Sequence, residues 1–304
     1  MKKYLIILLM VAGAILYSSC DRDELFEREQ YKPVFALLSD DGFNIFAEEH
    51  DLELEESPGF ISAVCGGTLP TEKDINITVA EDESLLLQYN LRNFDVEESK
   101  YARWLPRNSY DIENYSITIP AGERIGLMPL KIRANGLSPD TIYFIPLRVD
   151  RFSSYELNST KSTVLYRVFM KNYYATNQSV TNYTFHGKSD GINVMGSKRV
   201  FPVRGNSVRT MAGNLNFESS VDVINKGAVL LTVDKENKVL IQPWKDLNVI
   251  QIDGDPDYPN TFSIYNDGYS TYKTFLLRYN YVYDGKTYQI QEELRLEFKE
   301  KNDY

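Results

Sequence analysis

Apolar side chains recur at every second position through most of this chain, and this spacing limits its possible folds more than any other feature. Clear examples are Tyr115-Ile117-Ile119, Leu130-Ile132 and Val164-Tyr166-Val168-Met170. A period of two places alternate side chains on opposite faces of a strand, so that one face is buried and the other meets solvent. We therefore predict an all-β protein.

One segment departs from this pattern. Between Ser84 and Asn93, the residues Leu85, Leu86 and Tyr89 could face inward together, after an acidic run that ends at Glu83. This spacing is typical of a helix. We expect one helix here.

Turn signals separate the strands of the first half at intervals of about ten residues. They are Pro120-Ala121-Gly122, Asn135-Gly136 and Ser138-Pro139-Asp140. Short strands with regular turns predict a β-sandwich, which we place over residues 31–171. The polar stretch from Lys171 to Ser179 has no apolar period and predicts a domain boundary.

The second half, residues 172–304, has hairpin signals of its own. Ala228–Val233 returns as Val239–Gln242, and Phe275–Tyr283 returns as Lys286–Phe298 after the turn Asp284-Gly285. Asp-Gly is a strong hairpin signal because both central residues of a type I′ turn need positive φ. The closing strands are long, so we predict an antiparallel curled sheet or an open barrel.

The first residues read as a lipoprotein signal peptide. Lys2 and Lys3 precede the uncharged run from Leu5 to Leu16, which is shorter than the ~20 residues that span a bilayer. Small residues then precede Cys20, so we predict a signal peptide over residues 1–19 and acylation of Cys20. The rival interpretation is an ordinary secretory signal. Several acyl chains, such as palmitate, would hold the chain on a membrane surface.

The residues after Cys20 are acidic, from Asp21 to Glu24. We predict a tether over residues 20–30, whose charge either keeps it solvated or directs the protein to the outer face of the outer membrane.

Net charge limits the possible binding partners, and the cysteine count limits the possible disulfides. The net charge of -10 argues against nucleic acid and anionic lipid as partners. If Cys20 is acylated, Cys65 is left without a partner among the two cysteines. Its apolar surroundings predict a buried, inert strand residue.

Three motifs resemble a known family. They are Tyr101-Ala102-Arg103-Trp104-Leu105-Pro106 with Tyr110, Ile117-Thr118-Ile119-Pro120-Ala121-Gly122, and Ile142-Tyr143-Phe144-Ile145-Pro146-Leu147, preceded by Tyr89-Asn90. Together they resemble the immunoglobulin-like N-terminal domain of unknown function in Bacteroidetes surface lipoproteins. The segment from Tyr279 to Phe298 is similar to the lipocalin-like β domain that follows it.

The resemblance implies an outer-membrane lipoprotein of a polysaccharide-capture system, which binds glycans beside other glycan-uptake lipoproteins. The resemblance assigns no binding residue, because its motifs are those of structural strands and turns. Some relatives carry a glycoside hydrolase family 18 barrel, which needs about 250 residues. Its signature of three aspartates and a glutamate is absent from this sequence, so no such enzyme is predicted.

The sequence gives little support for metal binding or catalysis. Asp253, Asp255 and Asp257 could converge on Ca²⁺, but an EF-hand loop would need glycine at Tyr258 and glutamate at Ile264, so an acidic turn is preferred. The two histidines, His50 and His186, lack partners at metal spacing. No serine lies in a Gly-x-Ser-x-Gly elbow. The sequence predicts no catalytic residue, metal or cofactor.

Sugar binding needs aromatic rings that lie flat on a pyranose, with polar groups beside them for its hydroxyls. The whole chain has 22 tyrosines. The densest group of aromatic and polar residues lies in its second half. The predicted glycan-binding residues are Trp244, Asp246, Tyr258, Tyr265, Asn266, Tyr269 and Tyr272. The rival interpretation is that these rings pack the sheet, as we expect for Trp104.

Together these patterns predict a non-enzymatic surface lipoprotein with a sandwich as spacer and a C-terminal domain that binds a polysaccharide or oligosaccharide. Two alternatives stay open. A surface adhesin or structural interaction protein would use exposed apolar or tyrosine-rich patches. A glycoside hydrolase would need two carboxylates across a cleft.

Overall fold

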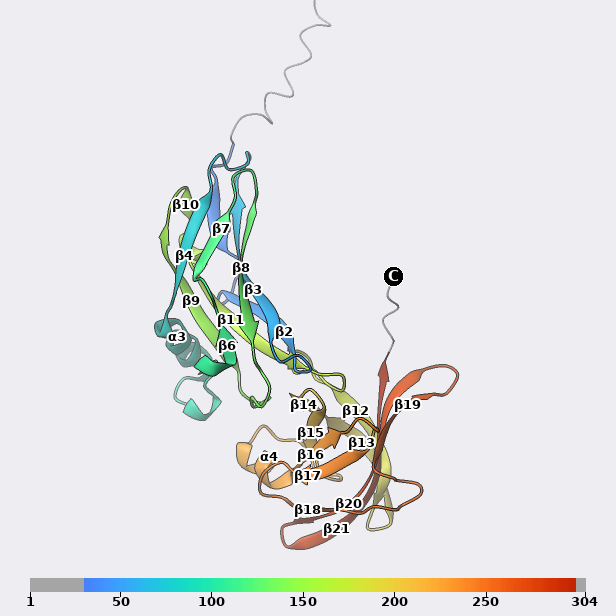
Figure 1. Ribbon diagram of the computed structural model, residues 1–304. Coiled ribbons are helices and arrows are strands. Elements are labelled where there is room, and N and C mark those ends of the chain that lie inside the picture. Colours follow the sequence, from blue (N-terminus) through green and yellow to red (C-terminus); the bar gives the residue numbers. More distant parts are fainter. Residues whose placement is uncertain (1–29, 299–304) are drawn as a thin grey trace, which may run out of the picture.

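The computed structural model describes residues 30–298, and within them strands dominate (Figure 1). The predicted signal peptide, Cys20 and residues 21–29 of the predicted tether lie outside the described residues. No helix in the described range is long and apolar enough to cross a bilayer. The all-β class predicted from the two-residue period is confirmed.

Two sheets form a sandwich in the first half of the chain. The strands of the first sheet, in spatial order, are β10 (Glu156–Leu157), β1 (Val34–Leu37), β3 (Ser57–Gly66), β8 (Ile125–Ile132) and β6 (Tyr110–Asp111). Those of the second are β2 (Ile45–Asp51), β11 (Thr163–Lys171), β9 (Tyr143–Phe152), β4 (Ile75–Glu81) and β7 (Ser116–Ile119), with β5 (Arg103–Trp104) beside β9.

The predicted alternation puts the core between these sheets. Ile117 and Ile119 on β7, Leu130 and Ile132 on β8, and Tyr166 on β11 are all buried in one cluster. The turn signals lie between strands, and glycine is needed at two of them, because Gly122 has φ 84° and Gly136 has φ 83°. Cys65 is buried on β3, and burial raises the pKa of its thiol, as expected for an inert residue.

The predicted helix is α3 (Glu83–Phe94). Asp82 caps it by accepting a hydrogen bond from the Ser84 backbone N–H at 3.0 Å. Leu86 and Tyr89 are buried against Phe144 of β9, while Leu85 is half-buried. Three short 3₁₀ helices accompany the strands of this half, η1 (Glu98–Lys100), η2 (Arg107–Ser109) and η3 (Ser159–Lys161).

The second half contains a large curled sheet and a small sheet (Figure 1). The large sheet has, in spatial order, β13 (Ile192–Arg199), β12 (Asn182–Ser189), β21 (Lys286–Phe298), β20 (Thr271–Tyr283) and β18 (Asn248–Gln251), with β19 (Thr261–Asn266) also on β20. The small sheet has β14 (Phe201–Arg204), β15 (Ser207–Met211), β16 (Ala228–Val233) and β17 (Val239–Pro243). The helix α4 (Val221–Gly227) precedes β16.

Both predicted hairpins of this half are confirmed. β20 pairs with β21 through the Asp284-Gly285 turn, where φ is 49° and 76° as a type I′ turn requires. β16 pairs with β17 in the other hairpin. A second core, which includes Phe275, Leu277 and Leu231, lies between the two sheets. The predicted curled sheet is therefore also confirmed.

A buried arginine joins the two halves. The Arg209 guanidinium on β15 donates two hydrogen bonds to the carboxylate of Asp140, one of them 2.7 Å from Nη2 to Oδ1. Its Cζ lies 4.7 Å from the ring centroid of Phe201 and 5.2 Å from that of Trp244. The Arg209 side chain is 1% exposed. Its charge thus depends on one residue of the sandwich for compensation.

Replacing Asp140 with alanine should lower the free energy of unfolding by about 2–3 kcal/mol, because it leaves the Arg209 charge buried without a partner. The effect should be smaller than for a wholly buried pair, since Asp140 keeps 25% of its side chain exposed. Urea unfolding followed by circular dichroism measures it. Asp222→Ala, which breaks the exposed Asp222–Lys226 pair, is the control and should change nothing measurable. Equal effects of the two variants would contradict this role for Arg209.

Candidate functional site

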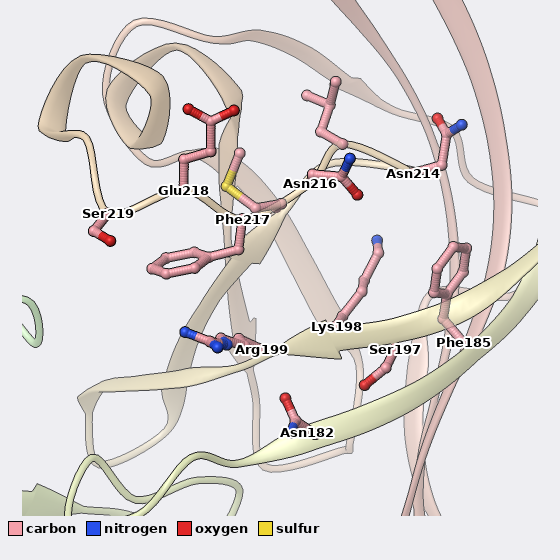
Figure 2. Close-up of a pocket in the computed structure, with 12 residues that line it drawn as sticks. Asn182, Phe185, Ser197, Lys198, Arg199, Asn214, Asn216, Phe217, Glu218 and Ser219 are labelled. Carbon is pink, nitrogen blue, oxygen red and sulfur yellow. The ribbon is translucent and has the colours of Figure 1, made fainter.

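A cavity of about 590 Å³ lies at the corner where the curled sheet meets the small sheet (Figure 2). β13 ends at Arg199 and β14 begins at Phe201, so the chain passes from one sheet to the other at Val200. The segment from Asn214 to Ser219, between β15 and α4, forms the opposite wall. A volume of this size is typical of small-ligand sites.

Twelve side chains line this cavity, and most are polar. They are Asn182, Phe185, Ser197, Lys198, Arg199 and Met211 from the strands, and Asn214, Leu215, Asn216, Phe217, Glu218 and Ser219 from the segment. All three asparagines are exposed. Each amide can offer both a donor and an acceptor to a ligand.

The segment is attached to the core at Gly213, where φ is 50°. A Cβ there would come within 2.8 Å of side-chain atoms of Ile290 and Tyr281, so only glycine fits without a shift. The Gly213 N–H donates to the Tyr279 hydroxyl at 2.7 Å. This attachment sets where the chain leaves the core, and the residues that follow line the cavity.

The floor of the cavity contains a buried ion pair. Lys198 Nζ is bonded to the Glu292 carboxylate, and the two side chains are 3% and 1% exposed. The Tyr279 hydroxyl donates to Glu292 Oε1 at 2.9 Å. Burial lowers the pKa of Lys198, while the carboxylate of Glu292 opposes that shift. Such a pair is costly compared with apolar packing, so its place beside a cavity marks a candidate site.

The rim contains one supported aromatic ring. The Phe217 ring centroid lies 5.1 Å from that of Phe201, and the Arg199 Cζ lies 5.2 Å from the Phe217 ring. In Figure 2 the Phe217 ring lies on the same side of the cavity as Arg199 and Glu218. Phe217 is half-buried and therefore presents apolar surface at the entrance. Such a surface can stack on the apolar face of a ligand ring.

Comparison with known proteins reproduces this two-part architecture. A family model described as an N-terminal domain matches residues 34–156, and one described as a C-terminal domain matches residues 162–295. A structure of unknown function from Bacteroides ovatus covers 90% of this chain and 98% of its own, with a TM-score of 0.63 and 15% identity. The chain belongs to a family of two-domain Bacteroidetes proteins of unknown function.

Two further structures share this family's fold. A multidomain protein from Bacteroides ovatus that includes a domain of unknown function has a TM-score of 0.62 and 15% identity, covering 88% of this chain and 95% of its own. An auxiliary nutrient-binding protein from Bacteroides thetaiotaomicron has a TM-score of 0.55 and 17% identity, covering 84% and 92%. No curated protein matches the chain by sequence. These likenesses establish the fold that this family shares.

The glycan-binding residues predicted from sequence lie in separate places. Trp244 follows β17, is half-buried, and packs against the cluster of Met211, Ile224 and Ala228. Asp246 is exposed and its backbone N–H donates to the Asn225 carbonyl at 2.9 Å. Trp244 is thus tied to the buried Arg209 and the small sheet rather than to the predicted tyrosines.

Four of the predicted residues lie together on the hairpin of β19 and β20. Tyr265 and Tyr272 are opposite each other, and the Arg295 Cζ lies 4.8 Å and 5.9 Å from their ring centroids. Asn266 donates to the Thr271 hydroxyl at 3.0 Å. Tyr269 is 99% exposed at the tip. The structure therefore brings these residues together on the outer face of the curled sheet, away from its core.

Tyr258 lines a second hollow of about 320 Å³ on that outer face, together with Lys188 and Glu293. Within the acidic group before it, Asp255 accepts hydrogen bonds from Gln291 and from the backbone of Asp257 and Tyr258. These bonds, that of Gln291 first, lower the pKa of Asp255. Its carboxylate thus stabilises the turn.

Neither histidine is among the twelve residues that line the cavity of about 590 Å³. His50 is buried in the sandwich, and His186 is exposed on β12 of the curled sheet. Over residues 30–298, no group of three or more histidine, cysteine, aspartate or glutamate side chains gathers as metal ligands would. Trp104, expected in the core, is half-buried against it, and its Nε1–H donates to the Tyr110 hydroxyl at 3.1 Å.

Sequence reasoning missed the cavity residues. Lys198 and Glu292 are 94 positions apart and look like ordinary strand residues, so nothing local reveals that they meet. A usable signal was the run Asn214-Leu215-Asn216-Phe217-Glu218, which places an aromatic residue among polar ones between two apolar strands. That run indicates the cavity of about 590 Å³ as a second candidate site beside the tyrosine-rich stretch.

Proposed function

We propose that this protein binds glycans in the cavity between β13 and the Asn214–Ser219 segment, without catalysing a reaction. The observation that carries the proposal is one supported aromatic ring, Phe217, beside the three exposed asparagine amides at the same cavity. A sugar offers an apolar ring face for the phenyl ring and hydroxyls that both donate and accept for the amides. Phe217 is the stacking platform in this proposal.

The cellular setting belongs to the same proposal. Acylation of Cys20 and the acidic residues behind it would hold the protein on the outer face of the outer membrane, as an accessory of polysaccharide capture. One protein of this fold is described as an auxiliary nutrient-binding protein, which is in line with a binding role. In this arrangement the sandwich is the spacer between the lipid and the binding domain.

The composition of the cavity supports binding over hydrolysis. A two-carboxylate glycosidase needs a pair of acidic side chains on either side of the sugar. Among the residues described as lining this cavity, Glu218 is the one carboxylate. Glu292 lies behind Lys198 and is bonded to both Lys198 and Tyr279.

A second candidate function, adhesion to another protein, is favoured by one surface of the sandwich. Phe60 on β3 and Ile125 and Leu127 on β8 are 41%, 58% and 52% exposed. The two strands are paired, so these apolar side chains share the outer face of the first sheet. Exposed apolar groups of this kind are typical of interaction surfaces.

Affinity electrophoresis in native gels with a wide polysaccharide panel tests the proposed function. We expect one or a few glycans to retard the protein, and Phe217→Ala to abolish that retardation because it removes the ring at the entrance. A stacking ring contributes about ten-fold or more to affinity. The absence of retardation across the whole panel would exclude glycan binding.

Two further variants test whether the glycan binds in the cavity or on another surface. Tyr272→Ala removes a ring of the outer face, and Trp244→Ala removes the tryptophan beside Arg209. Tyr272→Ala should retain binding if the cavity is the site. Trp244→Ala should weaken binding only as far as it loosens the cluster that contains Met211, against which Trp244 and Phe217 both pack. Loss on Tyr272→Ala with retention in Phe217→Ala would instead assign the outer face, as the sequence predicted for Tyr265, Asn266 and Tyr269.

A further inference from the structure

The charges at the cavity cancel one another. At the floor, the Lys198 ammonium is neutralised by the Glu292 carboxylate in direct contact. At the rim, Arg199 and Glu218 contribute one charge of each sign. The lining residues together with Glu292 therefore add no net charge to a bound ligand's surroundings.

Lys198 keeps donors to spare. An ammonium group has three N–H donors, and the structure shows one hydrogen bond from Nζ among the described residues, to Glu292. In Figure 2 the Lys198 side chain rises from β13 into the cavity, toward the segment that contains Asn214 and Asn216. The Lys198 side chain is 3% exposed and Nζ lies 5.0 Å from the Phe185 ring centroid, so a ligand oxygen accepts from Lys198 only at the bottom of the cavity, with the ion pair intact.

We infer that the cavity selects an uncharged sugar segment, and that Lys198 is the specificity-determining residue, donating to a hydroxyl or ring oxygen of that segment. The inference rests on the proposed function and narrows it to a ligand class. A ligand carboxylate would compete with Glu292 for Lys198 and leave one anion buried without compensation. A ligand cation would meet the Lys198 ammonium. A ligand hydroxyl is uncharged and leaves the net charge of Lys198 and Glu292 at zero.

A matched pair of ligands tests the selection. The probe is the neutral polysaccharide that retards the protein in the panel, compared with the same polymer after its primary alcohols have been oxidised to carboxylates. Isothermal titration calorimetry should show at least about ten-fold weaker binding of the oxidised polymer. The difference should persist at high salt, which screens long-range repulsion from the acidic protein surface.

Variants of the ion pair test the role of Lys198. The double variant Lys198→Met/Glu292→Gln removes both charges together, so no unpaired charge is left in the core. It should bind the neutral polysaccharide about ten-fold more weakly, since it lacks the charged donor. Arg295→Met, on the outer face of the same sheet, is the matched control and should bind as the parent does.

The outcomes separate this inference from the proposed function. Equal or tighter binding of the oxidised polymer, or full affinity in the double variant, would overturn the inference while glycan binding stood. Binding of acidic polysaccharides alone from the panel would overturn it in the same way. Binding of neither class would overturn both.

Discussion

Glu292→Gln should lower the free energy of unfolding of the C-terminal half by about 3–5 kcal/mol. The variant leaves the Lys198 ammonium in the core without its counter-charge, at a side chain that is 3% exposed. Trp244 can report on this half, because the other tryptophan of the chain lies in the sandwich. Urea unfolding followed by Trp244 fluorescence in a Trp104→Phe background therefore measures the effect.

Two control variants test whether the loss of stability comes from the unpaired Lys198 ammonium. The double variant Lys198→Met/Glu292→Gln should recover most of the lost stability, because it leaves no buried charge while an amide oxygen can still accept from Tyr279. Glu293→Gln changes the next residue of β21, which pairs with the partly exposed Arg295, and should cost less than about 1 kcal/mol. A double variant as unstable as Glu292→Gln would show that the loss does not come from the unpaired lysine.

The second large effect should appear as a dependence of stability on pH in the sandwich. His50 is buried on β2, with Nε2 2.9 Å from the Tyr166 hydroxyl and Nδ1 3.1 Å from the Ser57 hydroxyl. The Tyr166 hydroxyl donates to Glu48, so it accepts from Nε2–H, and Nδ1 accepts from Ser57. Both ring nitrogens of the neutral imidazole are thereby satisfied.

Burial lowers the pKa of His50 to about 4, from a usual value near 6.5. Between these values the unfolded chain binds a proton that the folded sandwich excludes. The stability due to His50 is therefore complete above pH 6.5 and is lost as pH falls toward 4, by about 3 kcal/mol in all. Trp104 fluorescence in a Trp244→Phe background reports the unfolding of this half.

Other groups also contribute to the pH dependence of the parent, so His50→Gln is compared with the parent. His50→Gln should lose about 3 kcal/mol less than the parent between pH 7 and pH 4, because it has no imidazole to protonate. His186→Gln, at the other histidine, should follow the parent since that side chain is exposed. Parallel pH profiles of the parent and His50→Gln would refute the role of His50.

Local patterns were sufficient for most of the secondary structure. The two-residue alternation at Ile117 and Ile119 predicts which face of β7 is buried, and Asp284-Gly285 predicts the turn of the longest hairpin. The helix at residues 84–93 was also predictable, because its apolar spacing differs from that of its neighbours. These features depend on contacts between residues that are near in sequence or on backbone preferences of single residues.

The candidate site was not predictable in the same way. Trp244 and Tyr265 are both aromatic residues in a polar stretch, yet one packs beside a buried arginine and the other lies on an outer face. Phe217 was not among the predicted site residues, although it lies at a cavity entrance, supported by Phe201 and Arg199. Aromatic composition says how much ring surface is present, and only packing decides which rings stay available to a ligand.

The all-β class, the two strand-rich halves and the hairpin turns follow from the amino-acid sequence, because period and turn chemistry are local properties. The contact of Lys198 with Glu292, and of Glu292 with Tyr279, beneath a cavity comes from long-range packing, because it depends on how the edge strand of the curled sheet leads into the small sheet. Charges that are 94 residues apart attract one another strongly once folding has removed the water between them.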